Sequence, residues 1–324
     1  MTESKKYPWH DSAWQHVQSM AEQERLPHAL LILGQDGLDN DQLAKQIVTS
    51  ILCLHPSTDF TACGLCHSCQ LMSAESHPDH HIVAPEEAGK VIKVDQIREL
   101  ISKQSLMPKI SPAKTVIISQ ADQMNHNAFN SLLKLLEEPT NNTVLVLIAN
   151  NSHALPITIK SRCQNLNIRT PDTDTAMQWL SLNQDQFSAE QCDVLLKMTN
   201  NSPLSALALG ESGLEQYEQI MSGITLLMKV QANPIELTAQ WQAFDPMVIM
   251  MQLQRLFETK ISTLLKSPST EQSQILRPYW AIVDCILHTM KLLSSKNNAN
   301  TTLLMEDFMV AVMQQASVIR SHQK

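Results

Sequence analysis

Four cysteines lie close together in this 324-residue chain and could share one metal ion. They are Cys53, Cys63, Cys66 and Cys69, in the spacing C-x9-C-x2-C-x2-C. Four thiolates can complete a tetrahedral zinc site and leave no open position for a substrate, so the pattern predicts a structural Zn²⁺. Disulfides and inert buried thiols are the alternatives, but the spacing favours a metal.

Other potential metal ligands occur near the cluster and further along the chain. Three histidines invite a second metal hypothesis, although four cysteines already fill one shell: His77, His80 and His81. The remaining cysteines are scattered singly and are expected in the core or at interfaces: Cys163, Cys192 and Cys285. An independent zinc-dependent nucleic-acid-binding protein is one alternative function. Positions 53–69 contain no lysine or arginine, however, so we expect no phosphate contact there.

The loop after the first apolar run has the outline of a phosphate-binding loop without its working residues. A functional loop reads G-x-x-x-x-G-K-[ST]: its backbone N–H groups and lysine bind phosphate, and its hydroxyl holds Mg²⁺. Gly34 and Gly37 are present, but Asp39, Asn40 and Asp41 stand where glycine, lysine and Ser/Thr belong. One like-charge pair about 4 Å apart costs roughly 4 kcal/mol at an effective dielectric near 20. We expect no ATP binding or only weak binding; the alternative is an ordinary turn capped by an aspartate.

The apolar run 115–119 predicts a second strand that ends in the wrong side chains for ATP hydrolysis. An enzyme that uses Mg²⁺ needs acidic residues at this edge, one for the metal and one for water. Ser119 and Gln120 occupy those positions and can do neither job well. Asp122 is predicted to cap a helix instead.

These positions require a sheet whose strands end beside one another. Apolar runs that alternate with helical segments predict the strands: 29–33, 81–84, 115–119 and 144–149. This order indicates an α/β fold with a largely parallel sheet and helices on both faces. Beyond 214 the apolar spacing is helical throughout. We predict three domains, namely a nucleotide-binding-like domain with a zinc module, a small helical lid and an all-helical domain: 1–170, 171–212 and 213–324.

A helix and a triplet downstream carry a family resemblance. The helix runs from Asn127 and ends in Leu-Leu-Glu-Glu-Pro at Pro139, and the triplet is Ser161-Arg162-Cys163. In this spacing the two motifs resemble subunits of the bacterial DNA polymerase III clamp loader, which belong to the AAA+ family. Together with the loop and the cysteines, the resemblance covers residues 1–170.

The resemblance implies a P-loop-type AAA+ domain, a lid at 171–212 and a ring-forming collar at 213–324. It also implies that Arg162, flanked by Ser161 and Cys163, reaches as an arginine finger into a neighbouring subunit's ATP site. Such a finger supplied in trans can be worth about 10³ to 10⁵ in rate. The implied partners are the tau/gamma ATPase subunits and the delta subunit, and through them the sliding clamp and primed DNA.

The chain also departs from the ATP-hydrolysing members of that family. Leu204 stands where their lid helix carries a nucleotide-sensing arginine. Three parts of an ATP site are therefore missing, so we expect a non-catalytic stator subunit. The enzyme alternative is a weak or unconventional NTPase that uses Glu137 or Glu138.

The composition is that of an ordinary globular protein, with 43% hydrophobic residues and a formal net charge of −8. The acidic balance argues against strong autonomous DNA binding. Apolar stretches are no longer than strands and the first residues are polar, so neither a membrane span nor a secretory signal is expected. The expected location is the bacterial cytoplasm.

Overall fold

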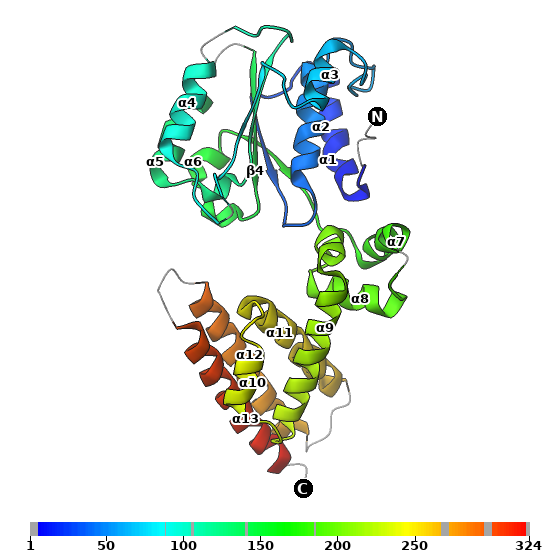
Figure 1. Cartoon of the computed structure of the whole chain (residues 1–324), viewed down its shortest axis with the longest axis vertical. Coiled ribbons are helices and arrows are strands. Elements are labelled where there is room, and N and C mark those ends of the chain that lie inside the picture. The colour runs from blue at the N-terminus through cyan, green and yellow to red at the C-terminus, as the bar shows by residue number, and fades with distance from the viewer. Residues whose placement is uncertain are drawn as a thin grey trace. The chain divides into compact units, whose positions relative to one another are not determined.

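The computed structural model describes residues 6–87, 89–104, 107–139, 142–184, 186–266, 272–294 and 300–321. The first five residues, on which the expected lack of a secretory signal partly depends, lie outside this description. The chain divides into two compact units: Met1–Gln186 with Thr199–Ala208, and Phe187–Met198 with Leu209–Lys324 (Figure 1). The segment 171–212 is shared between the units, and the three-domain division remains a prediction.

A five-stranded parallel sheet forms the centre of the first unit, in the order β2-β3-β4-β1-β5. Its strands are β1 (Ala29–Leu33), β2 (His80–Val83), β3 (Lys114–Ile118), β4 (Thr143–Ala149) and β5 (Gln164–Asn167). The three inner strands are largely buried because helices cover both faces, which explains their continuous apolar sequences. The parallel α/β prediction is confirmed. Strand β5 was not predicted, since Leu166 is its one apolar residue.

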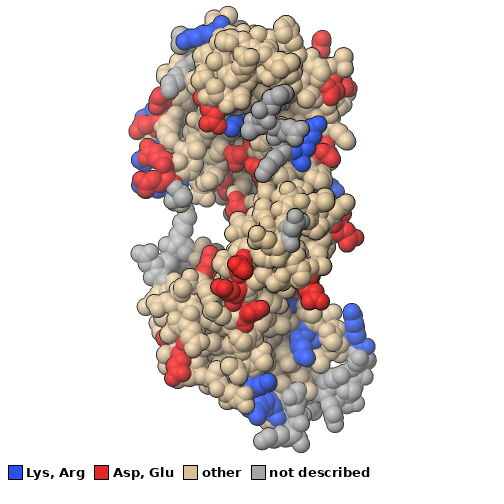
Figure 2. All heavy atoms as spheres, turned by 45° about the vertical axis from the view of Figure 1, so that its right-hand side comes forward, with Lys and Arg blue, Asp and Glu red and all other residues tan. Residues whose placement is uncertain are grey.

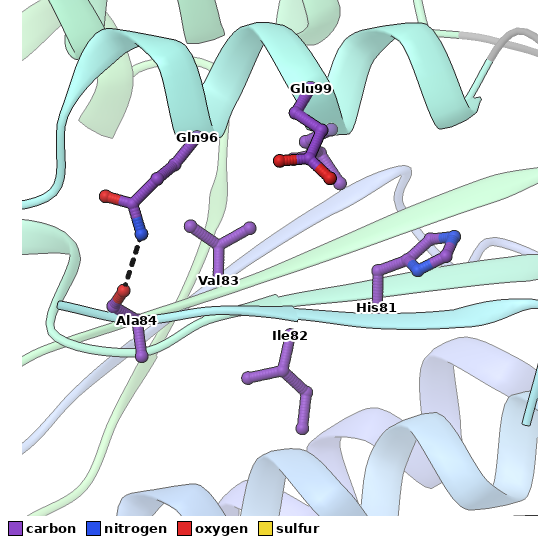
Figure 3. Close-up of a pocket in the computed structure, with 7 residues that line it drawn as sticks. His81, Ile82, Val83, Ala84, Gln96 and Glu99 are labelled. Atoms are coloured by element: carbon purple, nitrogen blue, oxygen red, sulfur yellow. Dashed lines mark hydrogen bonds between the residues drawn. The ribbon is translucent and has the colours of Figure 1, made fainter. Parts of the chain in front are cut away.

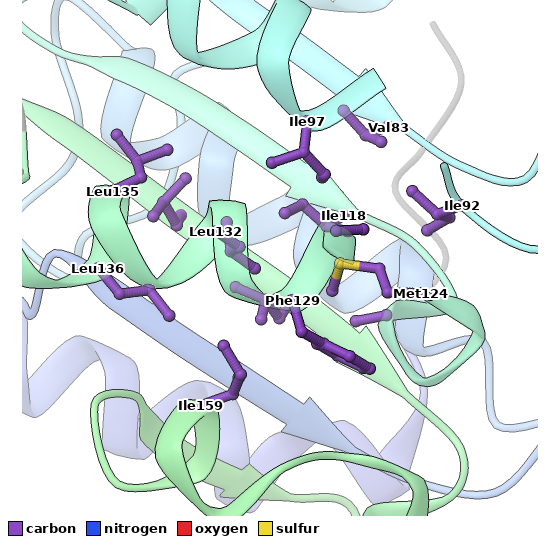
Figure 4. Packing of buried hydrophobic residues seen from close by; sticks show 14 of the residues in the cluster. Val83, Ile92, Ile97, Ile118, Met124, Phe129, Leu132, Leu135, Leu136 and Ile159 are labelled. Carbon is purple, nitrogen blue, oxygen red and sulfur yellow. The ribbon is translucent and has the colours of Figure 1, made fainter. Parts of the chain in front are cut away.

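Helices pack on both faces of this sheet (Figure 1). One face carries α1 (Asp11–Glu22), α2 (Asn40–Leu52) and α3 (His67–Ser73); the other carries α4 (Val94–Gln104), α5 (His126–Glu137) and α6 (Ile157–Lys160). Figure 4 shows the second face, where Phe129 and Leu132 of α5 lie among Ile118 and Ile97. Each such side chain contributes about 1.5 to 3 kcal/mol when fully buried. The hydrophobic packing on the two faces of the sheet fixes where each loop leaves it.

Shorter elements complete the first unit. They are the 3-10 turns η1 (Pro8–His10), η2 (Ala121–Gln123) and η3 (Ser152–Ala154), and the helix α7 (Thr173–Asn183). The segment 199–208 adds the start of α9 (Pro203–Met228), a helix that continues past a kink at Gly210. The kink has φ +52° and ψ −141°, a conformation that glycine adopts readily.

The second unit is all-helical in its described residues, as predicted. Its elements are α8 (Ala189–Met198), the later part of α9, α10 (Pro234–Gln240), α11 (Pro246–Leu265), α12 (Gln272–Leu293) and α13 (Thr301–Ser321). Its core includes Trp241, Met250, Phe257, Ile282 and Met309, so many of the methionines serve packing. None of the described helices is both long and apolar enough to cross a bilayer.

Candidate functional site

The loop after β1 keeps the turn of a phosphate-binding loop although its side chains have changed. Gly37 has φ +74°. Asp39 has φ +55° and ψ +51°, in the left-handed region, although it stands where the loop pattern has glycine. Aspartate is one of the few residues that tolerate this conformation. The backbone therefore still turns from β1 into the N-terminus of α2.

The Asp39 carboxylate lies at the N-terminus of α2, where a working loop would hold phosphate. Its Oδ1 accepts a hydrogen bond from the Gln42 N–H at 3.3 Å, and its Oδ2 accepts one from the Tyr7 hydroxyl at 2.9 Å. Burial, together with this bond to Asp39, raises the pKa of Tyr7 to about 12. An internal anion thus already satisfies the positive end of the helix.

Asn40, in the lysine position, is turned back into the loop. Its Nδ2 donates to the carbonyl oxygen of Gly34 at 3.0 Å and to that of Gln35 at 3.4 Å. Asn40 is only 5% exposed, and a Cβ atom at Gly34 would lie 2.6 Å from its Oδ1. The side chain therefore fills the space that the loop encloses. A neutral amide engaged in this way cannot neutralise a phosphate.

Asp41, in the Ser/Thr position of the loop, is hydrogen-bonded to Ser119, which follows β3. The Ser119 hydroxyl donates to Asp41 Oδ1 at 2.5 Å, so the loop carries the carboxylate and the strand carries the hydroxyl. Gln120 has φ +51° and begins η2 without a side-chain capping bond. The prediction that Asp122 caps a helix is wrong. Asp122 lies inside η2, and its Oδ2 accepts the N–H of Asn151 at 3.1 Å.

The segment 199–208 packs directly on the loop. The Ser202 hydroxyl donates to the carbonyl oxygen of Asp36 at 2.8 Å, and the Leu204 N–H donates to that of Gly37 at 3.3 Å. The Leu204 side chain, in the position predicted for a lost arginine, is partly buried against the core beside α1 and α2. Direct hydrogen bonds therefore attach the segment to the loop.

Aromatic side chains of η1 also form hydrogen bonds to the loop. Trp9 Nε1 donates to the carbonyl oxygen of Leu38 at 2.8 Å, and His10 Nε2 donates to the same oxygen at 2.7 Å. The Trp9 ring stacks on Tyr7 with 5.0 Å between centroids and meets Trp179 of α7 edge-on at 5.4 Å. These contacts join η1, the loop and α7 into one packed group.

The four predicted zinc ligands come together at the end of α2 and the start of α3. Cys53 Sγ lies 3.5 Å from Cys63 Sγ and 3.9 Å from Cys66 Sγ, and Cys63 Sγ lies 4.0 Å from Cys69 Sγ. All four sulfurs lie within 4.8 Å of one another. Zinc–sulfur bonds of about 2.3 Å in a tetrahedron would separate the sulfurs by about 3.8 Å. The residues present therefore fit a closed Zn²⁺ site.

Backbone amides donate to three of the four sulfurs, although burial raises the pKa of the Cys53 and Cys69 thiols. The N–H of Cys63 donates to Cys53 Sγ at 3.3 Å, that of Cys66 to Cys63 Sγ at 3.4 Å, and that of Cys69 to Cys66 Sγ at 3.4 Å. Burial opposes the thiolate of Cys66, but N–H donors from Cys69 and Leu54 outweigh it and lower its pKa to about 6. Thiolates are the form that binds a metal.

The nearby histidines have other partners. His77 Nε2 is hydrogen-bonded to the hydroxyls of Ser68 at 2.9 Å and Ser111 at 3.1 Å. His80 Nδ1 is bonded to the Thr115 hydroxyl at 2.9 Å, and burial lowers the pKa of His80 to about 4. In the described part of the chain, the four cysteines are the one group of His, Cys, Asp and Glu placed to share a metal. The second metal hypothesis gains no support.

Arg162 lies at the surface just after α6, with its guanidinium held by two acceptors. Its Nη2 donates to Glu137 Oε1 at 2.7 Å, and its Nη1 donates to the carbonyl oxygen of Thr158 at 3.0 Å. The side chain is 36% exposed. Ser161 ends α6 on one side, and Cys163 packs on the core on the other, where burial raises the pKa of its thiol to about 12. The triplet thus anchors the backbone and leaves the arginine side chain at the surface.

Arg162 lies at the amino ends of the parallel strands, whereas the loop lies at their carboxyl ends. Strand β5 begins at Gln164, which is level with Leu30 of β1. Gly34 is four residues beyond Leu30 (34 − 30), about 13 Å further along the strand at 3.3 Å per residue, whereas Arg162 precedes β5. Arg162 is therefore badly placed to serve the loop of its own chain.

The same topology argues against Glu137 and Glu138 as the catalytic residues of the enzyme alternative. Glu137 is the last residue of α5 and Glu138 is its C-cap; both precede β4, at the amino ends of the strands. Consistent with this, His28, just before β1, donates from Nε2 to the carbonyl oxygen of Leu136 at 3.1 Å. Phosphates held by the loop would lie at the carboxyl edge, so these glutamates are not placed to act on them.

A shallow hollow lies elsewhere, between β2 at the edge of the sheet and α4 (Figure 3). It is lined by His81, Val83 and Glu99 among others, and Gln96 Nε2 donates across it to the carbonyl oxygen of Ala84 at 2.9 Å. Of the candidate residues named from the sequence, His81 alone lines it. On the face that Figure 2 shows, lysines and arginines form small separate groups with acidic side chains between them.

A family profile and the curated relatives agree on one family. Residues 9–172 match a family profile described as "DNA polymerase III, delta subunit". DNA polymerase III subunit delta' of Pseudomonas aeruginosa is 36% identical over 238 residues, which cover 73% of this chain and 71% of that protein. The Escherichia coli protein of the same name is 33% identical over 203 residues, covering 63% and 60%. Among solved structures, a DNA polymerase III gamma subunit-related protein of Thermotoga maritima gives a TM-score of 0.47 at 16% identity, covering 94% of this chain and 99% of that one.

Proposed function

Since this chain belongs to the DNA polymerase III subunit delta' family, we propose that it is a non-catalytic stator of the clamp loader that supplies Arg162 in trans. Its proposed partners are the tau/gamma ATPase subunits and the delta subunit. Through them it acts on the sliding clamp and primed DNA. The second unit forms the collar in this proposal, and a structural Zn²⁺ on the four cysteines stabilises the first unit.

One observation carries the proposal: the closed loop and the arginine lie at opposite ends of the strands of one sheet. Arg162 is at the surface and cannot easily reach its own loop, while its planar donors suit the charge that develops on a transferring phosphate. An acceptor on a second subunit gives such an arginine a chemical role.

The loop geometry supports a subunit without a nucleotide cycle. Asp39 replaces the phosphate at the start of α2, Asn40 fills the loop, and Ser202 and Leu204 attach the next helix to it. No ATP, or only weakly bound ATP, is expected in this chain. Because these contacts need no ligand, the first unit keeps one shape while its neighbours bind and hydrolyse ATP. A fixed reference of this kind lets Arg162 favour the neighbour's ATP-bound state over its other states.

The proposal is tested in the reconstituted clamp loader with primed DNA. Arg162→Ala should remove the contribution of the one ATP site that it serves, whose rate should fall by about 10³-fold or more. The steady-state ATPase rate and single-turnover hydrolysis are measured after mass photometry has established that the complex assembles.

Arg169→Ala is the matched control. Arg169 is an exposed arginine beyond the other end of β5, so its loss changes the net charge equally. It should leave the rate unchanged. An Arg162→Ala complex that assembles and hydrolyses ATP at the parent rate would refute the trans role and leave only an architectural one.

A further inference from the structure

We propose that Glu137 is a positioning residue for Arg162, an inference that rests on the function proposed above. The Glu137 carboxylate accepts a hydrogen bond from Nη2 at 2.7 Å, and the Thr158 carbonyl accepts one from Nη1 at 3.0 Å. The two acceptors come from different helices, α5 and α6. Together they hold the guanidinium in one orientation at the surface before a partner arrives.

The arrangement leaves donors available for a second acceptor. A guanidinium has five N–H donors, and the two bonds use two of them, so three (5 − 2) remain for a second acceptor. Glu137 can therefore keep its bond while Arg162 contacts a neighbouring subunit. This distinguishes a positioning residue from a competitor that must be displaced.

Both acceptors are themselves fixed by the fold. Glu137 is the last residue of α5, and the preceding Leu135 and Leu136 are 4% and 2% exposed in the core. Thr158 lies in the single turn of α6, where Ile159 is fully buried. Carbonyl groups at a helix C-terminus lack helical partners and favour a cation, so the guanidinium also completes the end of α6.

Positioning matters because a long side chain loses much rotamer freedom when it is ordered. An arginine already oriented in the free subunit loses less freedom when it meets the transition state in a neighbour. Both partners are partly exposed, at 36% and 50%, so the pair is weak and the effect should be moderate.

The first test uses the isolated full-length chain. The ¹⁵Nε–¹Hε relaxation of Arg162 should report an ordered side chain in the parent protein and a mobile one in Glu137→Ala. Glu138→Ala is the matched control, because Glu138 is an exposed neighbour of equal charge, and it should leave Arg162 ordered. An Arg162 side chain as mobile in the parent protein as in Glu137→Ala would overturn the inference without involving any partner.

The second test measures ATP hydrolysis in the reconstituted loader. Glu137→Ala should lower kcat of the served site about fivefold with KM for ATP unchanged, which is about 1 kcal/mol at 1.36 kcal/mol per tenfold change. Glu137→Gln keeps an acceptor oxygen and should recover part of this loss. In an Arg162→Ala background, Glu137→Ala should have no further effect.

The outcomes separate the two proposals. A large loss in Arg162→Ala with an unchanged or raised rate in Glu137→Ala would overturn the positioning role and keep the trans arginine. An unchanged rate in Arg162→Ala would overturn both. A rise in KM alone, or an equal fall in rate in Glu138→Ala, would indicate a general surface effect and also count against Glu137.

Discussion

Gly37→Ala should detach the segment 199–208 from the loop, because no room exists for the added methyl group. Its Cβ would lie 2.0 Å from Ser205 Oγ, 2.2 Å from Ser202 Oγ and 2.8 Å from the Ser205 backbone nitrogen. Hydroxyls can rotate away, but the backbone nitrogen cannot. The segment must therefore shift as a whole.

The cost can be worked out from the contacts that this shift breaks. Several hydrogen bonds join the segment to the loop. The two between Gln35 and Asn200 are exposed and contribute little, whereas Ser202 to Asp36 and Leu204 to Gly37 contribute about 1 kcal/mol each. The left-handed φ of +74° adds about 1 to 2 kcal/mol of strain for alanine in the folded state. Local opening of the segment should become easier by about 2 kcal/mol, while the strain lowers the overall stability separately.

Hydrogen exchange measured by mass spectrometry on peptides from 199–208 checks this, since it reads local opening directly. A change of about 2 kcal/mol should accelerate exchange about 30-fold at 1.36 kcal/mol per tenfold change. Gly89→Ala is the control, because Gly89 has φ +78° with nothing within 4 Å of an added Cβ. It should carry the strain alone and leave exchange at 199–208 unchanged. Unchanged exchange in Gly37→Ala would refute the idea that the closed loop holds this segment.

Two further predictions concern the metal and the partly buried His80. Cys66→Ser should reduce bound zinc from one per chain to none, measured by elemental analysis after dialysis, and should lower the melting temperature of the first unit. The control Cys285→Ser should keep its zinc. A Cys66→Ser protein that still binds zinc would contradict the ligand set. The folded pKa of His80, about 4, is below its ordinary value of 6.5, so its contribution to stability is complete above pH 6.5 and is lost as pH falls toward 4. Between pH 7 and pH 5 the parent protein should lose about 2 kcal/mol more free energy of unfolding in urea than His80→Gln; equal losses would show that His80 is not buried as a neutral ring.

Much of the first unit could be predicted because its signals are local. The apolar runs of β1, β3 and β4 are buried on both faces, and a strand in that setting needs apolar residues throughout. Strand β5 escaped prediction because its polar edge position imposes no such pattern. The cysteine spacing was informative for a similar reason, since a tetrahedral metal site accepts few ligand arrangements.

The error at Asp122 shows the limit of local reasoning. An aspartate after a strand is a reasonable helix cap by type, but its carboxylate instead accepts the N–H of Asn151, 29 residues away. The partners of Asp39 and Asn40 also could not be predicted from local sequence. Their types indicated a broken phosphate loop, but not that one would bond Tyr7 and the other would fill the loop. Which partner a polar side chain finds depends on elements that only folding brings together.

The sequence by itself determined the family, the α/β and all-helical parts, the loss of the lysine at Asn40 and the four thiols, because each depends on residue type and short spacing. Only the tertiary structure decided that the Asn40 side chain fills the loop and that Arg162 lies at the opposite end of the strands, beside Glu137. The physical reason is that strand order and register set distances between segments far apart in the chain. These distances, rather than residue types, decide whether an arginine can serve its own subunit or a neighbour.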